Sequence, residues 1–224
     1  MSQITVTAFK WVPPFAQGLV RDLRVRWALE EAGLPYEQKL LGPGENNSPE
    51  HRAVQPFGQV PVYQEGDLTL FESGAILVHI ARKSPVLMPA DDAGRMRVIQ
   101  WMFAALNSVE PHVSNFTAID LFYPDEEWAK LRRPSAEKFA RGRLEGLSNA
   151  LGTRDYLEND FTVADLLMTT ILRNLRHTRV VADFPNLAAL QARCEARPAF
   201  TRALNAQMAN FEKYAPRPEG KATT

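Results

Sequence analysis

Near the N-terminus, apolar residues recur first at the spacing of a strand and then at the spacing of a helix. Residues 4–9 (ITVTAF) are β-branched or apolar throughout, which predicts a strand. After a proline-rich loop, Leu19, Leu23 and Trp27 fall on one face of a predicted helix. Gly33 stands where the end of that helix would need a left-handed residue. The chain is therefore expected to open with a strand and a helix.

A second strand and a hairpin follow in the pattern. Residues 35–41 (PYEQKLL) predict a strand, which completes a strand–helix–strand unit. Residues 60–64 (VPVYQ) and 68–72 (LTLFE) are separated by turn-forming residues at the spacing of a hairpin. Residues 73–83 then have the apolar spacing of a helix. Residues 1–83 are thus predicted to form a small α/β domain.

The second half of the chain shows helical spacing and no clear strand pattern. Prolines interrupt the pattern at residues 84–89, which we interpret as a linker. Residues 90–224 are then predicted to form an all-α helical bundle that ends in a polar tail from about residue 215. Its helices are expected over residues 95–113, 126–151, 163–177, 186–196 and 199–214.

One of these helices carries a clear start signal. Thr162 can cap a helix whose third residue is Asp165, which is the pattern of a capping box. Phe161 and Leu166 occupy the positions of a hydrophobic staple around it. We interpret this motif as a folding device and not as a binding site.

The charge balance argues against a nucleic-acid or membrane partner. The 224 residues include 26 Lys or Arg and 26 Asp or Glu, so no net field would attract a polyanion or an acidic membrane. The N-terminus lacks a signal-peptide pattern, and no apolar stretch is long enough to span a bilayer. We therefore expect a soluble, cytoplasmic protein.

Cysteine and histidine give little support to disulfide or metal chemistry. Cys194 is the only cysteine, which excludes an internal disulfide and a cysteine-rich zinc site. Its helical spacing among apolar residues indicates a small core residue. The four histidines, at positions 51, 79, 112 and 177, do not have the spacing of metal ligands, so no metal site is predicted.

Pro61 lies inside a segment that otherwise resembles a strand, and two interpretations are open. A proline lacks the N–H of a strand ladder, so an ordinary trans proline would fit a strand start or a sheet edge. Local sequence favours this interpretation. A cis Val60–Pro61 bond is the alternative, and it would turn the N–H and C=O of Val60 outward, where they could pair with a peptide-shaped ligand.

The pair Glu72-Ser73 follows, where a strand should lead into a helix. Ser73 is a natural N-cap, and the free N–H groups and positive dipole end of a helix suit a carboxylate. Glu72 suits an ammonium group. Together they could hold the head group of an α-amino acid, although a simple cap beside a solvated glutamate is the structural alternative.

Taken together, the motifs of this chain resemble those of the cytosolic glutathione transferase family. Two segments, PFGQVPVY (56–63) and LFESGAILVHIAR (70–82), resemble the glutathione-binding half of that family. RVRWALEEAGLPYE (24–37) resembles its first helix and second strand, and FTVADLL (161–167) resembles its helical capping motif. The matches occur in both halves, in the expected order.

The resemblance implies a thioredoxin-like N-terminal domain, an all-helical C-terminal domain and usually a homodimer. Glutathione would be the co-substrate. Val60 would pair with the cysteinyl backbone of glutathione before a cis Pro61. Glu72 and Ser73 would hold the γ-glutamyl group, with help from Gln59.

The sequence departs from the family at the residue that acts on the thiol. Members carry Tyr, Ser or Cys near the start of the first helix, at a position that falls near Leu19 here. None of these three types occurs between Thr7 and Tyr36. The remaining polar groups of this loop are Trp11, Gln17, Arg21 and Asp22, with the backbone amides of residues 18–20. Of these side chains, Trp11, Gln17 and Arg21 are the catalytic candidates.

Each catalytic candidate also has a structural interpretation. Arg21 could form a solvated ion pair with Asp22, Trp11 could cover an apolar edge, and Gln17 could be ordinary loop polarity. Further along, the helical spacing of Arg173, Arg176 and Arg179 near a helix end favours a solvated face that complements the helix dipole.

The second substrate is expected to bind between the domains, against the first helix after the linker. The candidate residues on that helix are Trp101, Ala105, Asn107, Ser108 and His112.

Two hypotheses for function remain. The first is a glutathione transferase that adds the glutathione thiolate to a small hydrophobic electrophile, or uses it to reduce a peroxide or a disulfide. The second is a non-catalytic module of the same fold that binds glutathione or a protein partner, because the usual Tyr, Ser or Cys is missing. A thiol-conjugation assay with model electrophiles would separate them.

Overall fold

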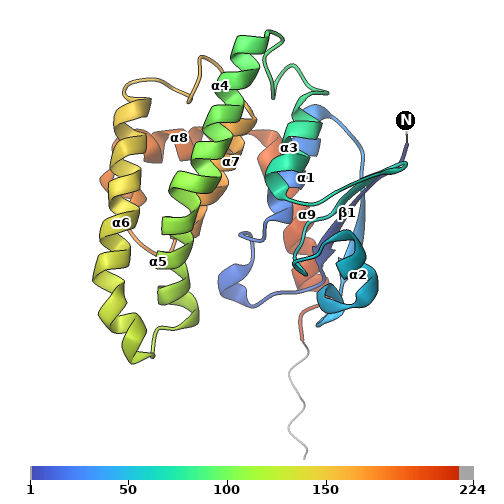
Figure 1. The fold of residues 1–224 in the computed structure, drawn as a ribbon, viewed down its shortest axis with the longest axis horizontal. Coiled ribbons are helices and arrows are strands. Elements are labelled where there is room, and N and C mark those ends of the chain that lie inside the picture. Colours follow the sequence, from blue (N-terminus) through green and yellow to red (C-terminus); the bar gives the residue numbers. More distant parts are fainter. Residues whose placement is uncertain (1, 217–224) are drawn as a thin grey trace, which may run out of the picture.

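A mixed four-stranded sheet forms the base of the first domain in the computed structural model, which describes residues 2–216 (Figure 1). The strands pair in the order β2-β1-β3-β4, with bounds β1 (Ile4–Phe9), β2 (Glu37–Leu41), β3 (Tyr63–Glu65) and β4 (Leu68–Leu70). β1 pairs with β2 in parallel and with β3 antiparallel, and β3 pairs antiparallel with β4. The parallel pair requires a crossover, which helix α1 (Asp22–Ala32) provides.

The first helix of this domain ends where the sequence predicted but begins later. Gly33 is left-handed, at φ 65°, and ends α1 as predicted. The start of α1 lies at Asp22, because the preceding loop is longer than its apolar spacing suggested and contains a 3-10 turn, η1 (Pro14–Ala16). Short helix α2 (Pro49–Val54), capped by Ser48, and helix α3 (Ser73–Ala81) complete the domain.

The second domain is built from helices, and no strand occurs among its described residues up to 216. Its helices are α4 (Asp92–Phe103), α5 (Glu110–Phe122), α6 (Glu127–Leu151), α7 (Val163–Leu172), α8 (Pro185–Glu195) and α9 (Pro198–Lys213). The expected fold class, a thioredoxin-like α/β domain followed by an all-helical domain, is confirmed. The segment interpreted as a linker lies between α3 and α4. Beyond residue 216, the predicted polar tail lies outside the described residues.

A π-helical segment, η3 (Ala104–Val109), joins α4 to α5, so one continuous helical run extends to Phe122. The N–H of Glu110 bonds the carbonyl of Ala105, five residues back. Pro111 accounts for this widened turn, because a proline cannot donate a helical hydrogen bond and its ring crowds the carbonyl four residues earlier. The sequence pattern predicted that this helix would end near residue 113, nine residues before its observed end at Phe122.

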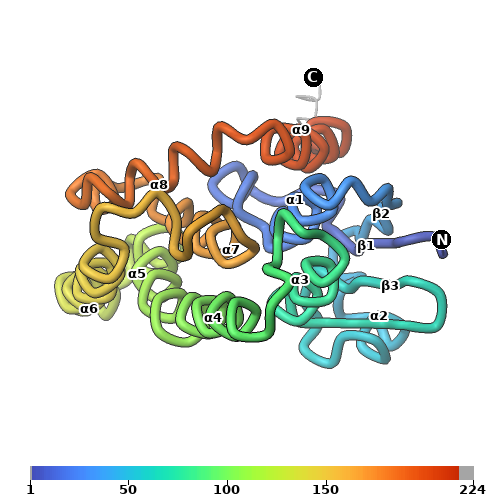
Figure 2. Tube along the Cα trace, turned by 90° about the horizontal axis from the view of Figure 1, so that it is seen from above, coloured from blue at the N-terminus to red at the C-terminus, as the bar shows by residue number. Residues whose placement is uncertain are grey.

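The last helix, α9, returns to the first domain and packs along α1 (Figure 2). The ring of Phe200 on α9 lies 4.8 Å from the fully buried ring of Trp27 on α1. Arg197, just before α9, bonds the carboxylate of Glu31 with Nε–Oε1 at 2.6 Å. Helix α9 and the residue before it therefore bind α1 through both apolar and ionic contacts.

Two local predictions about the helical domain are confirmed. The backbone N–H of Thr162 donates to Asp165 Oδ2 at 2.9 Å, and the N–H of Ala164 donates to Thr162 Oγ1, which completes the capping box at the start of α7. Cys194 is fully buried in the core, and burial raises the pKa of its thiol to about 12. No helix within residues 2–216 has the length and apolar character needed to cross a bilayer.

Candidate functional site

Two adjoining cavities lie between the domains. The polar cavity, of about 390 Å³, is lined by Gln55, Pro61, Glu72, Ser73 and Asn107, among others. The apolar cavity, of about 430 Å³, is lined mainly by apolar side chains that include Phe9, Phe15, Leu19, Leu121 and Phe122. Six residues line both cavities: Arg21, Arg24, Gln59, Val60, Glu110 and Ser114. A ligand in one cavity would therefore meet a ligand in the other at this shared wall.

All five residues predicted to bind glutathione line the polar cavity: Gln59, Val60, Pro61, Glu72 and Ser73. They come from the segment before β3 and from the start of α3. Residues that the sequence motifs grouped as one site therefore also line one cavity in the structure.

The Val60–Pro61 peptide bond is cis, as the family resemblance implied. The interpretation of Pro61 as an ordinary trans residue of a strand is wrong, because β3 begins two residues later, at Tyr63. Within the described part of the chain, the N–H and C=O of Val60 have no hydrogen-bond partner. This backbone is available to a ligand in the polar cavity.

Ser73 is the first residue of α3, and the N-cap position belongs to Glu72. The expectation that Ser73 caps the helix is therefore wrong. Its buried hydroxyl instead accepts a hydrogen bond from Arg24 Nη1 at 3.1 Å. Glu72 is the one non-glycine residue with positive φ among residues 2–216, at 66°, and its side chain makes no cap bond. A left-handed glutamate is strained, and such strain is typical of functional sites.

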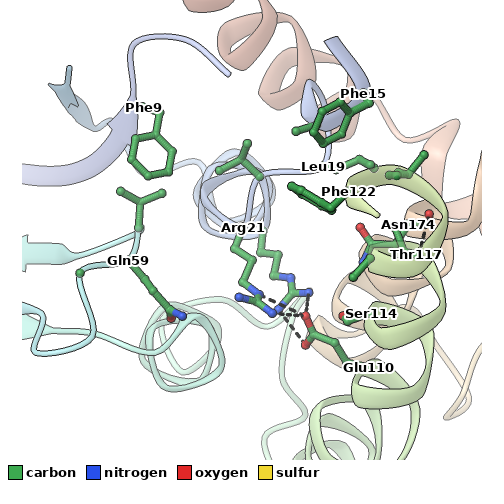
Figure 3. A pocket seen from close by; sticks show the side chains of 17 residues that line it. Phe9, Phe15, Leu19, Arg21, Gln59, Glu110, Ser114, Thr117, Phe122 and Asn174 are labelled. Atoms are coloured by element: carbon green, nitrogen blue, oxygen red, sulfur yellow. Dashed lines mark hydrogen bonds and ion pairs between the residues drawn. The ribbon is translucent and has the colours of Figure 1, made fainter. Parts of the chain in front are cut away.

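An ionic cluster forms the shared wall of the two cavities, and Figure 3 shows its side chains converging. Glu110 Oε1 accepts from Arg21 Nη2 at 2.9 Å and from Arg24 Nη2 at 2.8 Å. The Glu110 and Arg24 side chains are buried, whereas the Arg21 side chain is 45% exposed. Burial disfavours the charged form of Glu110, but the guanidinium groups of Arg24 and Arg21 outweigh it and hold its pKa below the usual range.

The local alternative for Arg21, an ion pair with Asp22, is wrong. Asp22 is buried and pairs with Arg26, with Oδ2–Nε at 2.6 Å. Arg21 points instead towards Glu110 and lines both cavities.

Arg21 is the only one of the three predicted catalytic side chains that lines either cavity between the domains. Trp11 and Gln17 line a separate hollow beside Met208 and Phe211 of α9. The side-chain amide of Gln17 also donates to the carbonyl of Val12 at 3.0 Å, so it is engaged within its own loop.

The backbone of the same loop offers hydrogen-bond donors near the apolar cavity. Within residues 2–216, the N–H groups of Gly18, Val20 and Arg21 have no hydrogen-bond partner, whereas the N–H of Leu19 donates to Ala16 O at 3.0 Å. Leu19, Val20 and Arg21 line the apolar cavity. These amides lie just before the first turn of α1, at the positive end of its dipole.

The residues predicted to bind the second substrate are mostly elsewhere. Of these, only Asn107 lines a cavity, and it is the polar one. Trp101 donates to Glu158, Ala105 is buried in the core, and His112 stacks on Phe139 with ring centroids 6.0 Å apart. Ser108 is exposed and lines neither cavity.

The apolar cavity takes its helical wall from α5, further along the chain. Side chains at the helical spacing of Glu110, Ser114, Thr117, Ala118 and Leu121 face it. None of these five was among the predicted residues, because the predicted helix ended at residue 113 and its phase was taken as uninterrupted α-helix. Pro111 was the available signal, since a proline inside a helical run changes the phase of what precedes it.

Arg173 and Arg176 do not form a solvated face. Arg176 Nη2 donates to the carbonyls of Phe15 at 3.0 Å and Gln17 at 2.7 Å, and Arg173 pairs with Glu195 at 2.9 Å. The interpretation of these arginines as helix-dipole partners is therefore wrong. They contact the loop before α1.

Residues 2–216 contain no group of three or more His, Cys, Asp or Glu side chains that could hold a metal ion.

Comparison with known proteins matches both domains. The family model for the glutathione S-transferase N-terminal domain matches residues 7–82, and that for the C-terminal domain matches residues 115–207. Glutathione S-transferase 4 of Zea mays is 32% identical over 219 residues, which cover 89% of this chain and 92% of that protein. A probable glutathione S-transferase, GSTF2, of Oryza sativa subsp. japonica is 33% identical over 185 residues, covering 76% of this chain and 84% of that protein.

A solved structure agrees with these matches. The glutathione transferase of Burkholderia graminis, crystallised with two glutathione molecules per subunit, matches with a TM-score of 0.80 at 28% identity, covering 92% of this chain and 88% of that chain. The chain therefore belongs to the glutathione S-transferase family. This membership confirms the expectation of a glutathione transferase with glutathione as co-substrate, and it does not favour the non-catalytic module.

Proposed function

We propose that this transferase binds glutathione in the polar cavity and joins its sulfur to a small hydrophobic electrophile held in the apolar cavity. The observation that carries this proposal is the shared wall, where six residues line both cavities. A reaction between two bound molecules needs their reacting atoms within about 3–3.5 Å. Adjoining cavities of opposite polarity supply that arrangement for a peptide and an apolar partner.

The glutathione peptide would run along Val60 and end at α3. Its cysteinyl backbone would pair with the free N–H and C=O of Val60, as a strand pairs with a strand. Its γ-glutamyl ammonium would meet Glu72, and the carboxylate would meet the N-terminal end of α3 at Ser73. Gln59, on the same wall, would complete the set.

The thiolate would be stabilised by the loop before α1. A thiol with a pKa of about 8.5 needs about 2.7 kcal/mol of preferential stabilisation of its anion to lower that pKa by two units. A helix N-terminus supplies about 0.3–1 kcal/mol, and one hydrogen bond to a charged group adds about 1.5–3 kcal/mol. The free amides of Val20 and Arg21, with the half-exposed Arg21 guanidinium, are enough for this purpose without a hydroxyl side chain.

The electrophile would be small and largely apolar. Aromatic and aliphatic side chains line most of the apolar cavity, and Ser114, Thr117 and Asn174 add a few polar groups on its helical side (Figure 3). This composition suits a ring or alkyl chain that carries one polar reactive group.

The proposal includes a cytoplasmic homodimer. Among the large apolar side chains exposed outside the cavities are Phe57 and Phe71 on the first domain, and Met96 and Phe103 on α4. Exposed apolar residues of this size favour a protein contact over open solvent. A single buried cysteine without a disulfide is consistent with a reducing compartment.

A conjugation assay with model electrophiles tests the function, together with calorimetric binding of glutathione. We expect saturable turnover that falls at least tenfold in the double variant Glu72→Ala, Ser73→Ala. Glutathione binding without conjugation or peroxide reduction, across a panel of electrophiles, would overturn the proposal in favour of a binding module.

A further inference from the structure

The helical domain holds the carbonyl groups of the loop before α1 from two sides. Arg176 Nη2, from the turn after α7, donates to the carbonyls of Phe15 and Gln17 at 3.0 and 2.7 Å. Gln207 Nε2, from α9, donates to the carbonyl of Val20 at 3.2 Å. These donors lie 159 or more residues away in the chain from the carbonyls they bind.

Arg176 makes no other side-chain hydrogen bond within the described residues, and the second hydrogen bond of Gln207 goes to Asp22, on the other side of Arg21. Gln207 is 1% exposed, and its amide also donates to Asp22 Oδ1 at 2.7 Å, so it spans the two residues that flank Arg21. Arg176 forms no ion pair with any carboxylate in residues 2–216, and its hydrogen bonds there go to the two loop carbonyls. Gly18 lies against both elements, since a Cβ there would stand 3.3 Å from Arg176 Nη1 and from Leu204 Cδ1.

A bound carbonyl orients the N–H of the next residue. A trans peptide is planar, and its C=O and N–H point to opposite sides. The Gln17 carbonyl faces Arg176, so the N–H of Gly18 faces the other way. The Val20 carbonyl faces Gln207, so the N–H of Arg21 points away from α9. Both of these N–H groups lack partners within residues 2–216.

We propose that Arg176 and Gln207 are positioning residues for the glutathione thiolate, acting through the two peptide groups that they hold. Gln207 would keep the Arg21 amide aimed at the sulfur, and Arg176 would hold the Gln17–Gly18 peptide of the same loop in place, so that no donor has to reorganise when the thiol ionises. This inference rests on the proposed function, in which loop amides stabilise the thiolate. Without the two tethers the loop would still bind glutathione but would stabilise its anion less.

The alternative is that the two residues only hold the domains together. In that case their loss would lower the melting temperature and leave the ionisation of bound glutathione unchanged. The two roles therefore differ in the pKa of the bound thiol, which a purely structural tether does not move.

The experiment is an ultraviolet pH titration of glutathione bound to the parent protein, Arg176→Ala, Gln207→Met and the control Arg179→Ala. Arg179 is exposed three residues from Arg176 and makes no side-chain hydrogen bond or ion pair within the described residues. We expect Arg176→Ala and Gln207→Met each to raise the thiol pKa by about half a unit to one unit. This corresponds to an ionisation constant of the bound thiol that is about three- to tenfold smaller. Because only the anion is bound less tightly, glutathione affinity at neutral pH should fall by no more than about threefold, and affinity well below the thiol pKa should be unchanged.

The outcomes separate this inference from the proposed function. A parent thiol that titrates like free glutathione would overturn the activation of the thiol by the loop, and with it both proposals. A depressed parent pKa that neither variant raises would overturn the positioning role alone.

A salt series separates positioning from charge. If the effect of Arg176→Ala were that of a lost cation, it would fade at about 1 M salt, where the screening length is about 3 Å. A pKa difference that vanishes there would overturn positioning by Arg176, and we expect it to persist. Gln207→Met changes no charge, and it keeps the proposal testable if Arg176→Ala destabilises the protein.

Discussion

The ring of Phe15 meets the ring of Phe122 edge-on, with centroids 4.9 Å apart and planes at 84°. Phe15 belongs to the loop before α1 and Phe122 ends α5, so this pair joins the two domains across the apolar cavity that both residues line (Figure 3). Both rings are partly exposed. The pair therefore forms part of the entrance to the cavity as well as its wall.

We predict that Phe122→Ala weakens the use of apolar electrophiles. An edge-to-face aromatic pair is worth about 0.5–1.5 kcal/mol, so kcat/KM for a hydrophobic electrophile should fall about two- to tenfold. The KM for glutathione should change little, because Phe122 does not line the polar cavity. Steady-state kinetics with each substrate varied in turn will measure both effects.

Phe139→Ala is the matched control for this variant. Phe139 is also about half exposed and also stacks on a neighbouring ring, that of His112, but it lines neither cavity. An equal loss of kcat/KM in both variants would contradict a role for the Phe15–Phe122 pair in substrate binding.

Glu72→Ala and Ser73→Ala are each expected to weaken glutathione binding by about tenfold or more. Hydrogen bonds to charged groups contribute about 1.5–3 kcal/mol each, and each variant removes one such contact in the proposed complex. Isothermal calorimetry gives the dissociation constants. Glu126→Ala is a matched control, because Glu126 is likewise an exposed N-cap residue without a side-chain cap bond. Unchanged binding in both test variants would contradict the assignment of Glu72 and Ser73 to glutathione binding.

Thr162→Ala should lower the free energy of unfolding by about 0.5–2 kcal/mol, because it removes the cap of α7. Urea denaturation measures this change. Thr162 lies in the helical core and lines neither cavity, so glutathione affinity should be unaffected. An unfolding curve identical to that of the parent would show that the capping box contributes nothing to stability.

We predict that the folded protein loses stability in acid because the Glu65 carboxylate becomes protonated. Its Oε2 accepts from Tyr63 Oη at 2.8 Å, lies 3.0 Å from His79 Nε2 and pairs with Lys83. The hydrogen bonds from Lys83 and His79 lower its pKa from 4.5 to about 2. Below pH 4.5 the unfolded chain therefore binds the proton more tightly, so this contribution to stability falls as the pH drops from 4.5 towards about 2.

Between about pH 5 and about pH 3 this contribution should fall by about 1 kcal/mol, after allowance for solvent screening of a group that is partly exposed. Urea denaturation of the parent and of Glu65→Gln at the two pH values isolates it, because the variant cannot titrate at this position. We expect the stability difference between the two proteins to shrink in acid. A difference that stays constant would show that the pKa of Glu65 is not lowered.

Features that depend on neighbouring residues were predicted from the sequence. The left-handed Gly33 at the end of α1 and the capping box of Thr162 and Asp165 are set by residues within a few positions of each other. The five residues predicted to bind glutathione line one cavity for a related reason, because they stand in two short motifs at the ends of neighbouring elements.

The features that were missed depend on long-range contacts or on helix phase. Arg176 is 159 residues from the Gln17 carbonyl that it binds, and nothing in its helical spacing indicates that partner. Similarly, the pairing of Arg21 with Glu110, 89 residues away, could not be inferred from its neighbour Asp22. The α5 residues that line the apolar cavity were missed because the π-helical turn before Glu110 changes which side chains face that cavity.

The packing of α9 along α1 determines the stage of synthesis at which the loop before α1 can be held in place. The loop before α1 leaves the ribosome well before Gln207, which lies 187 residues after Val20 in the chain. A nascent chain that has completed its sheet and α3 still lacks the side chain that holds the Val20 carbonyl. The site should therefore become complete only after α9 has left the ribosome, so a chain truncated before α9 is expected to lack the contact that fixes the peptide between Val20 and Arg21.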